Sequence, residues 1–437
     1  MLFALALALA PQASAAEMVW NGHYTARGTA VDSLSLSSEN ENAEGLSALF
    51  EHRAVLAPTL AVTPNIAFHS QLRILSNETW GASANAWSDT SGDAIPTVFA
   101  DGVAESQGVS LATAWADVYT SVGRLRFGRM PLEWGAGVLL NPGNQPDSEY
   151  GDVSDRVQFT TQVGGVFVMG AWDMVEEGYI GLNDDFQIAN AAIAYQSEVL
   201  ALGLLNRYRF QPSQDFGAYT GDVWGKAALG SLSAELELAI EIGGGDLSTG
   251  ENDISIFAWG GALNLAGEMC GYLVGFELGI ASGDTDPNDG ELTTFSFDRD
   301  YNRSILMFES PMPVLAANVM NSANGGREYD AVRLGDGISN AQYIRPWVGY
   351  SPMEGLDLEA AWFAARADQL PESETERSYG SEYSLTARWR PYDNFELDAT
   401  GALFTPGGYF SAYEHSELGG GFDALTYGGR LMATVEF

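Results

Sequence analysis

The sequence has almost no cysteine and few basic residues. Cys270 is the single cysteine among 437 residues, so no intramolecular disulfide framework can form. We interpret it as a small apolar side chain, buried or facing lipid. Lysine and arginine together number 20 against 58 aspartates and glutamates, which gives a formal net charge of −38. Because a nucleic-acid binder needs a basic surface, this composition excludes nucleic acid as an expected partner.

Long hydrophobic runs are also missing. The apolar stretch at residues 2–10 is too short to span a bilayer as a helix, and the small residues Ala13, Ser14 and Ala15 follow it. This pattern predicts a secretory signal peptide over residues 1–15, without the usual basic residue before its apolar core. We expect one domain over residues 16–437. If that domain lies in a membrane, it must do so as a closed barrel, because no later segment is apolar enough for a helix.

What the chain does have is alternation of apolar and polar residues. In the final segment, GGRLMATVEF, one face carries Leu431, Ala433 and Val435, and the other carries arginine, methionine, threonine and glutamate. Residues 232–242 and 395–403 repeat the pattern. A period of two is typical of strands with two different environments. Soluble β-sandwiches also alternate in this way, so the pattern alone leaves the class open.

Segment lengths and connections favour a membrane barrel. The alternating segments are about 9 to 13 residues long, which suits tilted membrane-crossing strands. Short connections at 120–123 and 390–394 contrast with long, acidic ones at 76–107 and 284–340. We predict an all-β fold, a closed antiparallel transmembrane β-barrel of about 18 strands (roughly 16 to 20), with short periplasmic turns and long acidic extracellular loops.

The C-terminal Phe437, which closes an alternating strand, resembles the signal by which bacterial outer-membrane barrels are recognised by their assembly machinery. The resemblance implies that the protein lies in the outer membrane of a Gram-negative bacterium. It also implies two partners, the outer-membrane lipid and the barrel assembly machinery. Aromatic residues near strand ends fit the girdles that lie at headgroup level: Trp20, Tyr24, Trp362, Trp389 and Tyr392.

A second resemblance rests on VGRLRFGRMPLEWGAGVLLN, residues 122–141. This stretch looks like the element of porin-like families in which a short turn leads to a Gly-Arg strand and an inward-folding Gly-rich loop. Together with the acidic residues 282–297 it is similar to alginate-export-type outer-membrane barrels. The resemblance implies a transport protein, a polysaccharide as one class of solute, and a constriction loop that includes Pro131, Glu133 and Trp134.

The basic residues of the alternating segments are predicted to face the lumen. Arginine supplies 19 of the 20 basic residues. The set comprises Arg27, Arg53, Arg73, Arg124, Arg126, Arg156, Arg207, Arg209, Lys226, Arg345, Arg388, Arg390 and Arg430. The same alternation turns acids inward: Glu235, Glu237, Glu241, Glu277, Asp357, Glu359, Glu396 and Asp398. Each arginine could stiffen the wall by pairing with one of these acids, or could face a solute, since its fork binds carboxylates.

Two functions follow from this interpretation. The first is an outer-membrane channel or porin that passes small-molecule or oligosaccharide solutes, small or polymeric and anionic, through an arginine-lined lumen. The alternative is a structural or adhesion barrel whose loops plug the lumen. Whether residues 131–146 fold inward as a constriction or close the pore distinguishes the two. The sequence leaves the oligomeric state open.

Other chemistry is weakly supported. Asp284, Asp286 and Asp289 have a spacing that could hold Ca²⁺, but they lack the closing glutamate of the full loop pattern, so we interpret the segment as a solvated loop and predict no metal site. The four histidines are scattered and form no serine–histidine arrangement. We therefore expect no enzymatic activity and no cofactor.

Overall fold

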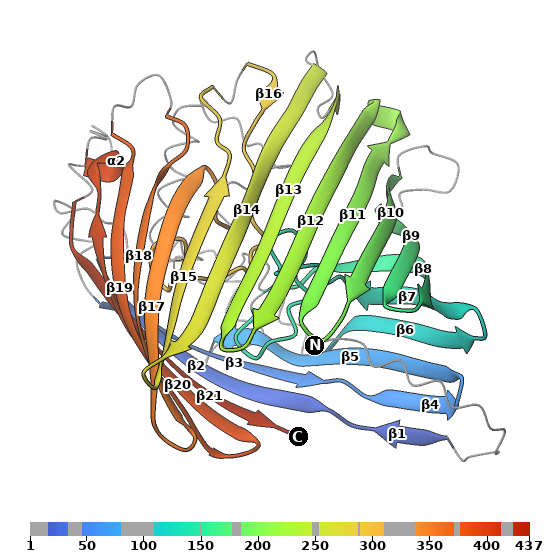
Figure 1. The fold of residues 1–437 in the computed structure, drawn as a ribbon, viewed down its shortest axis with the longest axis horizontal. Coiled ribbons are helices and arrows are strands. Elements are labelled where there is room, and N and C mark those ends of the chain that lie inside the picture. The colour runs from blue at the N-terminus through green and yellow to red at the C-terminus, as the bar shows by residue number, and fades with distance from the viewer. Residues whose placement is uncertain are drawn as a thin grey trace, which may run out of the picture.

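The computed structural model describes residues 16–33, 46–79, 109–148, 150–176, 185–246, 253–286, 289–309, 337–370, 376–411 and 423–437. These residues form one large, strongly tilted sheet that curves round on itself (Figure 1). None of the helices among them is long and apolar enough to span a membrane. The expected signal peptide, residues 1–15, lies outside the described residues.

Apart from the short strands β1, β4 and β16, each strand pairs antiparallel with the next one along the chain, and β2 closes the barrel by pairing with β21 from His23 opposite Glu436 to Val31 opposite Gly428. The short strands β1 and β4 continue β2 and β3 beyond an interruption, and β16 lies in a loop. The described residues therefore form a closed antiparallel barrel of 18 strands, as the sequence predicted. The strands are β1 (Glu17–Val19), β2 (Gly22–Asp32), β3 (Leu46–Leu56), β4 (Thr59–Thr63), β5 (Ile66–Thr79), β6 (Ser110–Thr120), β7 (Gly123–Pro131), β8 (Val153–Val163), β9 (Val166–Glu176), β10 (Phe186–Gln196), β11 (Leu200–Gln211), β12 (Phe216–Leu229), β13 (Leu232–Asp246), β14 (Asp253–Met269), β15 (Tyr272–Ala281), β16 (Glu291–Leu292), β17 (Ala341–Met353), β18 (Leu356–Ala367), β19 (Ser378–Tyr392), β20 (Phe395–Pro406) and β21 (Thr426–Glu436).

Alternation turns large apolar side chains outward. On β13, Leu236, Leu238 and Ile240 are exposed, whereas Glu237 and Ala239 between them are buried. Similar exposed apolar residues occur on strands all round the barrel. Such a belt would be unfavourable in water and is stable against lipid tails. The chain is thus a transmembrane barrel, and closed antiparallel barrels of this design belong to the bacterial outer membrane.

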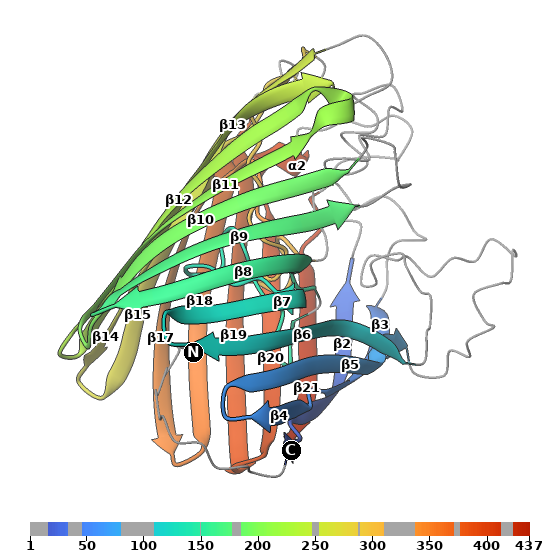
Figure 2. The same ribbon diagram turned by 90° about the vertical axis from the view of Figure 1, so that its right-hand side faces the viewer.

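The two ends of the barrel differ. Tight connections of two or three residues, at 64–65, 121–122, 164–165, 197–199, 230–231, 270–271, 354–355 and 393–394, alternate along the chain with longer ones, so they lie together at one end (Figure 2). This matches the predicted arrangement of turns. Cys270 occupies one of them with a φ of 55°, beside Gly271 at 83°. Its side chain is exposed, so the interpretation of Cys270 as buried is wrong, and the alternative that it faces lipid stays a prediction.

Phe437 lies at the seam where the barrel closes. Its backbone N–H donates to the carbonyl of Gly22 at 3.0 Å, and the N–H of Gly22 donates to the carbonyl of Phe437 at 2.8 Å. The ring lies over Gly22 so closely that a Cβ there would come within 2.8 Å of it. Phe437 thus extends the pairing of β2 with β21 by one residue, and its role as an assembly signal stays a prediction.

Candidate functional site: the lumen and its inward loops

Residues 132–152 between β7 and β8, of which residue 149 is not described, form a first inward loop. On one side, the indole Nε1 of Trp134 donates to Asp222 Oδ1 on β12 at 2.6 Å. On another, Arg53 on β3 donates from Nη2 to the carbonyl of Gly143 at 3.4 Å and from Nη1 to that of Ser148. A loop held by β12 and by β3 must extend across the lumen, because these strands are far apart in the barrel order.

The sequence-predicted constriction residues take different positions in this segment. Pro131 is the last residue of β7, and Glu133 is exposed. The ring of Trp134 lies over Gly203 on β11, where a Cβ would come within 2.8 Å of it. Residues 131–146 therefore fold inward, and their effect on conduction stays a prediction.

A second inward loop lies between β15 and β17, over the described residues 282–286 and 289–308. Its buried residues Phe295, Phe297, Tyr301, Leu306 and Met307 form one apolar cluster with the barrel wall. Small residues on the inner face make room for these rings, among them Ala258, Ala262, Ala281, Ala341, Ala365 and Ala367. The sequence predicted residues 284–340 as a long external connection, and the structure adds that its described part folds back into the barrel, where its aromatic residues gain an apolar environment.

The two inward loops contact each other. The N–H of Asp298 donates to the carbonyl of Val138 at 2.7 Å, and the N–H of Tyr150 donates to Asp300 Oδ1 at 3.1 Å. The carboxyl groups of Asp152 and Asp298 hydrogen bond to each other. Burial, and then the neighbouring Asp152, raise the pKa of Asp298 to about 9, so the pair shares a proton. The loops thus form one connected body inside the lumen.

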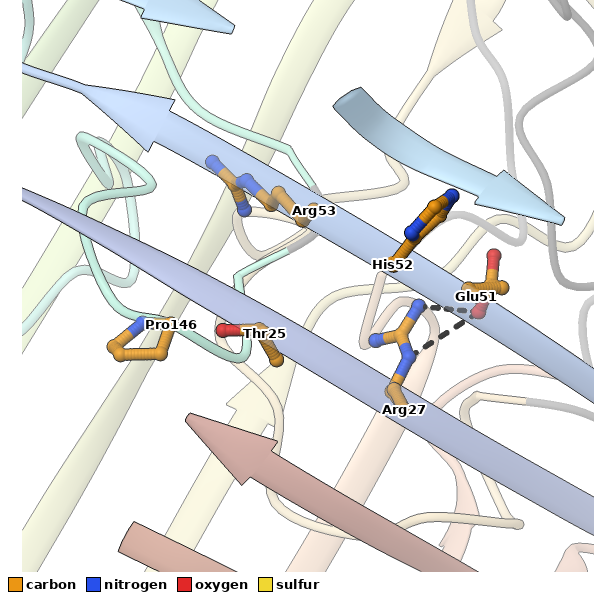
Figure 3. Close-up of a pocket in the computed structure, with 6 residues that line it drawn as sticks. All are labelled: Thr25, Arg27, Glu51, His52, Arg53 and Pro146. Atoms are coloured by element: carbon orange, nitrogen blue, oxygen red, sulfur yellow. Dashed lines mark hydrogen bonds and ion pairs between the residues drawn. The ribbon is translucent and has the colours of Figure 1, made fainter. Parts of the chain in front are cut away.

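Arginines of the inner face gather on one contiguous half of the barrel, from β21 through β2, β3, β5, β7 and β8 to β11. Figure 3 shows part of this wall, where Thr25 and Arg27 from β2 and Glu51 and Arg53 from β3 line a pocket together with Pro146 of the first inward loop. We call this half the arginine wall. It carries Arg430, Arg27, Arg53, Arg73, Arg124, Arg126, Arg156, Arg207 and Arg209.

Several arginines of the wall are held by carboxylates of nearby strands. Arg156 makes two hydrogen bonds to Asp173, at 2.5 and 2.7 Å. Arg27 contacts Glu51 at 2.7 Å. The remaining pairs are Arg126 with Asp117 at 2.7 Å, Arg124 with Asp117 at 3.8 Å and Arg209 with Glu241 at 3.0 Å. For these side chains the structure shows the wall-stiffening pairing, with Glu51, Asp117 and Asp173 as partners that the sequence interpretation did not name.

The other predicted lumen cations lie apart from the arginine wall and are also paired. Lys226 contacts Glu235 at 3.1 Å, and Arg345 pairs with Glu359. On β19, Arg388 lies 3.4 Å from Asp398, and Arg390 lies 3.1 Å from Asp357 and 2.5 Å from Glu396. Arg388 and Arg390 are close to the tight turn at 393–394. The structure therefore separates them from Arg207 and Arg209, with which the sequence interpretation grouped them.

Three arginines of the wall make no ion pair within 4 Å in the part of the chain that the structure describes: Arg73, Arg207 and Arg430. The Nε of Arg207 donates to Asn190 Oδ1 at 3.2 Å, which leaves its outer nitrogens available. Arg207 is flanked by Arg209 and Arg156 and also by the acids Asp152 and Asp173, and Asp300 is near Arg73, with these acids beyond ion-pair distance. Guanidinium groups bind carboxylates strongly, so these three side chains are chemically suited to binding an anion.

The aspartates considered as a weak calcium site, Asp284, Asp286 and Asp289, take part in loop hydrogen bonds. Asp284 accepts the N–H groups of Asp286 at 3.0 Å and of Thr293 at 3.1 Å, and Asp289 accepts that of Glu291 at 2.8 Å. Among the described residues, no three side chains of histidine, cysteine, aspartate or glutamate converge on a metal position. These carboxylates instead shape the loop through backbone hydrogen bonds.

Comparison with known proteins gives a likeness in fold. No protein-family model and no curated protein matches the chain. Among solved structures, a BenF-like porin from Pseudomonas fluorescens Pf-5 matches with a TM-score of 0.56 at 10% identity, and OccK9 (OpdG) of Pseudomonas aeruginosa with 0.56 at 12%. OpdK of Pseudomonas aeruginosa, solved with vanillate, matches with 0.52 at 11%. Each match covers 96% of this chain and 98% of the other. The fold is that of a porin-like outer-membrane barrel.

Proposed function

We propose that the chain is a non-enzymatic outer-membrane channel that passes small anionic solutes along its arginine wall. The observation that carries this proposal is the set of three inward arginines, Arg73, Arg207 and Arg430, that lack an ion-pair partner within 4 Å among the described residues. Where another arginine of the wall has a carboxylate partner, that partner largely neutralises its charge. An excess of fixed positive charge in a narrow lumen raises the local concentration of anions and excludes cations.

Small solutes are the better candidates than polymers. The resemblance of residues 122–141 to alginate-export-type barrels favours a polysaccharide, but none of the three porins reported above is described as an exporter of alginate. One of them, OpdK, was solved with vanillate, a small carboxylate. The first inward loop, held at both β3 and β12, also leaves less room for a polymer than an open barrel would.

Reversal potentials in planar bilayers under a salt gradient test the proposal. Replacing Arg207 or Arg430 by glutamine should shift the permeability ratio from anions towards cations. The matched control is Arg129→Gln, because Arg129 lies on the outer face of β7 and is half-exposed beside Asp155. An unchanged reversal potential in both lumen variants, with conductance intact, would show that these arginines do not select the solute.

A second function is favoured by one observation. The apolar cluster of the second inward loop and its contacts with the first loop fill part of the lumen with packed side chains. A barrel plugged in this way would be structural or adhesive, with its loops acting outside the membrane. Purified, folded protein that produces no discrete conductance steps in a planar bilayer would favour this alternative over the channel.

A further inference from the structure

A buried glutamate of the barrel wall binds the first inward loop. The side chain of Glu237 on β13 has 0% exposure and accepts backbone N–H groups of Ala136 at 2.5 Å, Val138 at 3.3 Å and Leu139 at 3.0 Å. The loop backbone curls around the carboxylate, since Gly135 has a φ of +59° and a Cβ there would lie 2.3 Å from Glu237 Oε2. The contact therefore requires both the acid and the glycine.

A second buried glutamate binds the second inward loop in the same manner. Glu382 on β19 is 1% exposed and accepts the consecutive N–H groups of Ile305 at 3.0 Å, Leu306 at 3.2 Å and Met307 at 2.8 Å. Runs of backbone N–H groups that converge on one point are recurrent binding sites for anions. Two loops that are unrelated in sequence thus use one device at two separate places on the wall.

Neither glutamate has an arginine or lysine within 4 Å among the residues that the structure describes. A buried carboxyl group without such a partner is unfavourable unless hydrogen bonds replace those it made with water. The loops supply these bonds, and the buried N–H groups of the loops are satisfied in turn. Each glutamate and its loop therefore depend on each other for a favourable environment.

We infer that Glu237 and Glu382 are positioning residues that hold the two inward loops against the wall and thereby set the size and steadiness of the channel. The conductance consequence rests on the proposed channel function. The positioning itself does not, because a loop can be held in place whether or not solutes pass. The two parts can therefore be tested by separate measurements.

The first measurement is thiol protection, with Val138→Cys as the reporter for one loop and Met307→Cys for the other, both in a Cys270→Ser background. Both positions are fully buried, so a water-soluble maleimide should react slowly. Glu237→Gln should speed labelling at position 138, and Glu382→Gln at position 307, each by about tenfold or more, because local opening exposes the thiol. Glutamine has the same size as glutamate, but it has one acceptor oxygen where glutamate has two. Its NH₂ group, which is a donor, would face the N–H donors of the loop and weaken the contact.

The matched control is Glu268→Gln, at the exposed end of β14 beside a tight turn. It should leave labelling at both positions unchanged. Heat-modifiable migration on gels identifies folded barrel in every variant. If Val138→Cys does not fold, Ala136→Cys, at a half-buried position, replaces it as reporter. Folded Glu237→Gln and Glu382→Gln barrels with unchanged labelling would overturn the inference.

The second measurement is open-channel current noise in planar bilayers. Each glutamine variant should raise the noise above that of Glu268→Gln, because a released loop moves within the conducting path. Faster labelling without any conductance in the parent protein would support the positioning role and contradict the proposed channel. Faster labelling with wild-type noise and conductance would show that the loops are held but do not set the pore, which overturns the second half of the inference.

Discussion

Asp117 is the residue whose loss should most disturb the arginine wall. Its side chain is 2% exposed, and its two oxygens accept Nε and Nη2 of Arg126 at 2.7 and 3.1 Å. Arg124 lies 3.8 Å away and His69 3.5 Å away. Asp117→Asn would therefore leave two closely spaced arginines without their shared carboxylate while preserving the shape of the side chain.

The expected loss of stability follows from these contacts. Two hydrogen bonds to a charged group contribute about 1.5 to 3 kcal/mol each, and breaking a buried ion pair costs about 3 to 5 kcal/mol. Lumen water reaches the Arg126 side chain, which is 14% exposed, and relieves part of this cost. We therefore expect the free energy of unfolding to fall by about 3 kcal/mol, at the lower end of the range.

Urea unfolding of the barrel in lipid vesicles, followed by tryptophan fluorescence, measures this difference. The control is Asp155→Asn, which breaks the half-exposed pair with Arg129 and should cost no more than about 1 kcal/mol. A loss below about 1 kcal/mol for Asp117→Asn would refute the reasoning. It would mean that the wall arginines are solvated well enough by lumen water to need no counter-ion.

Two further outcomes are expected. Deleting Phe437 should lower the amount of heat-modifiable barrel in the outer membrane, because the seam loses its last pairing, while secretion to the periplasm continues; an unchanged outer-membrane yield would argue against the assembly role. The pKa of Asp298 is raised from 3.8 to about 9 by burial and by Asp152. Between these two pH values, Asp298 is protonated while the loops are in contact and loses its proton when they separate. The contact between the loops is then fully stable at low pH and weakens as pH rises through that interval. Open-channel noise should accordingly increase from pH 5 to pH 9, and Asp298→Asn should remove that dependence.

The strands were predictable because alternation is a local property. Side chains two residues apart on a strand lie on the same face, so the alternation of residues 232–242 predicts that Glu235, Glu237 and Glu241 face the lumen. The structure confirms this. Strand ends were less predictable. β14 has 17 residues and ends at Met269, so it is longer than the predicted segments, and β5 contains an irregular register between Gln71 and Leu72. Such features depend on neighbouring strands and leave no periodic trace in the sequence.

Part of the ion pairing could also have been derived. A two-residue turn at 121–122 fixes the register of its hairpin, so that Asp117 must lie opposite Arg126. The turn at 164–165 likewise places Arg156 opposite Asp173. Pairs between strands that are not neighbours, such as Arg209 with Glu241, require the curvature of the whole barrel and could not be found this way.

The inward loops could be predicted only in part. A Gly-rich stretch after β7 resembles known inward loops, whereas the second loop was hidden by its acidic composition. Its aromatic residues, Phe295, Phe297 and Tyr301, were a signal, because exposed loops seldom need several aromatic residues so close together. Their destination depends on a row of small residues contributed by strands distant in sequence, which local reasoning does not connect.

The packing of the second inward loop on alanine-rich strands fills part of the barrel interior with side chains. Its side chains pack on the inner face of β14 to β20 and reach Val31 of β2, and Leu306 lies over Gly428 of β21. In the proposed channel, a solute that passes beside the guanidinium groups would meet them at contact range, whereas on the axis of an open barrel intervening water would weaken their attraction. In that channel, the strength with which the wall arginines attract a solute would depend on how the two inward loops fill the interior as well as on the number of strands.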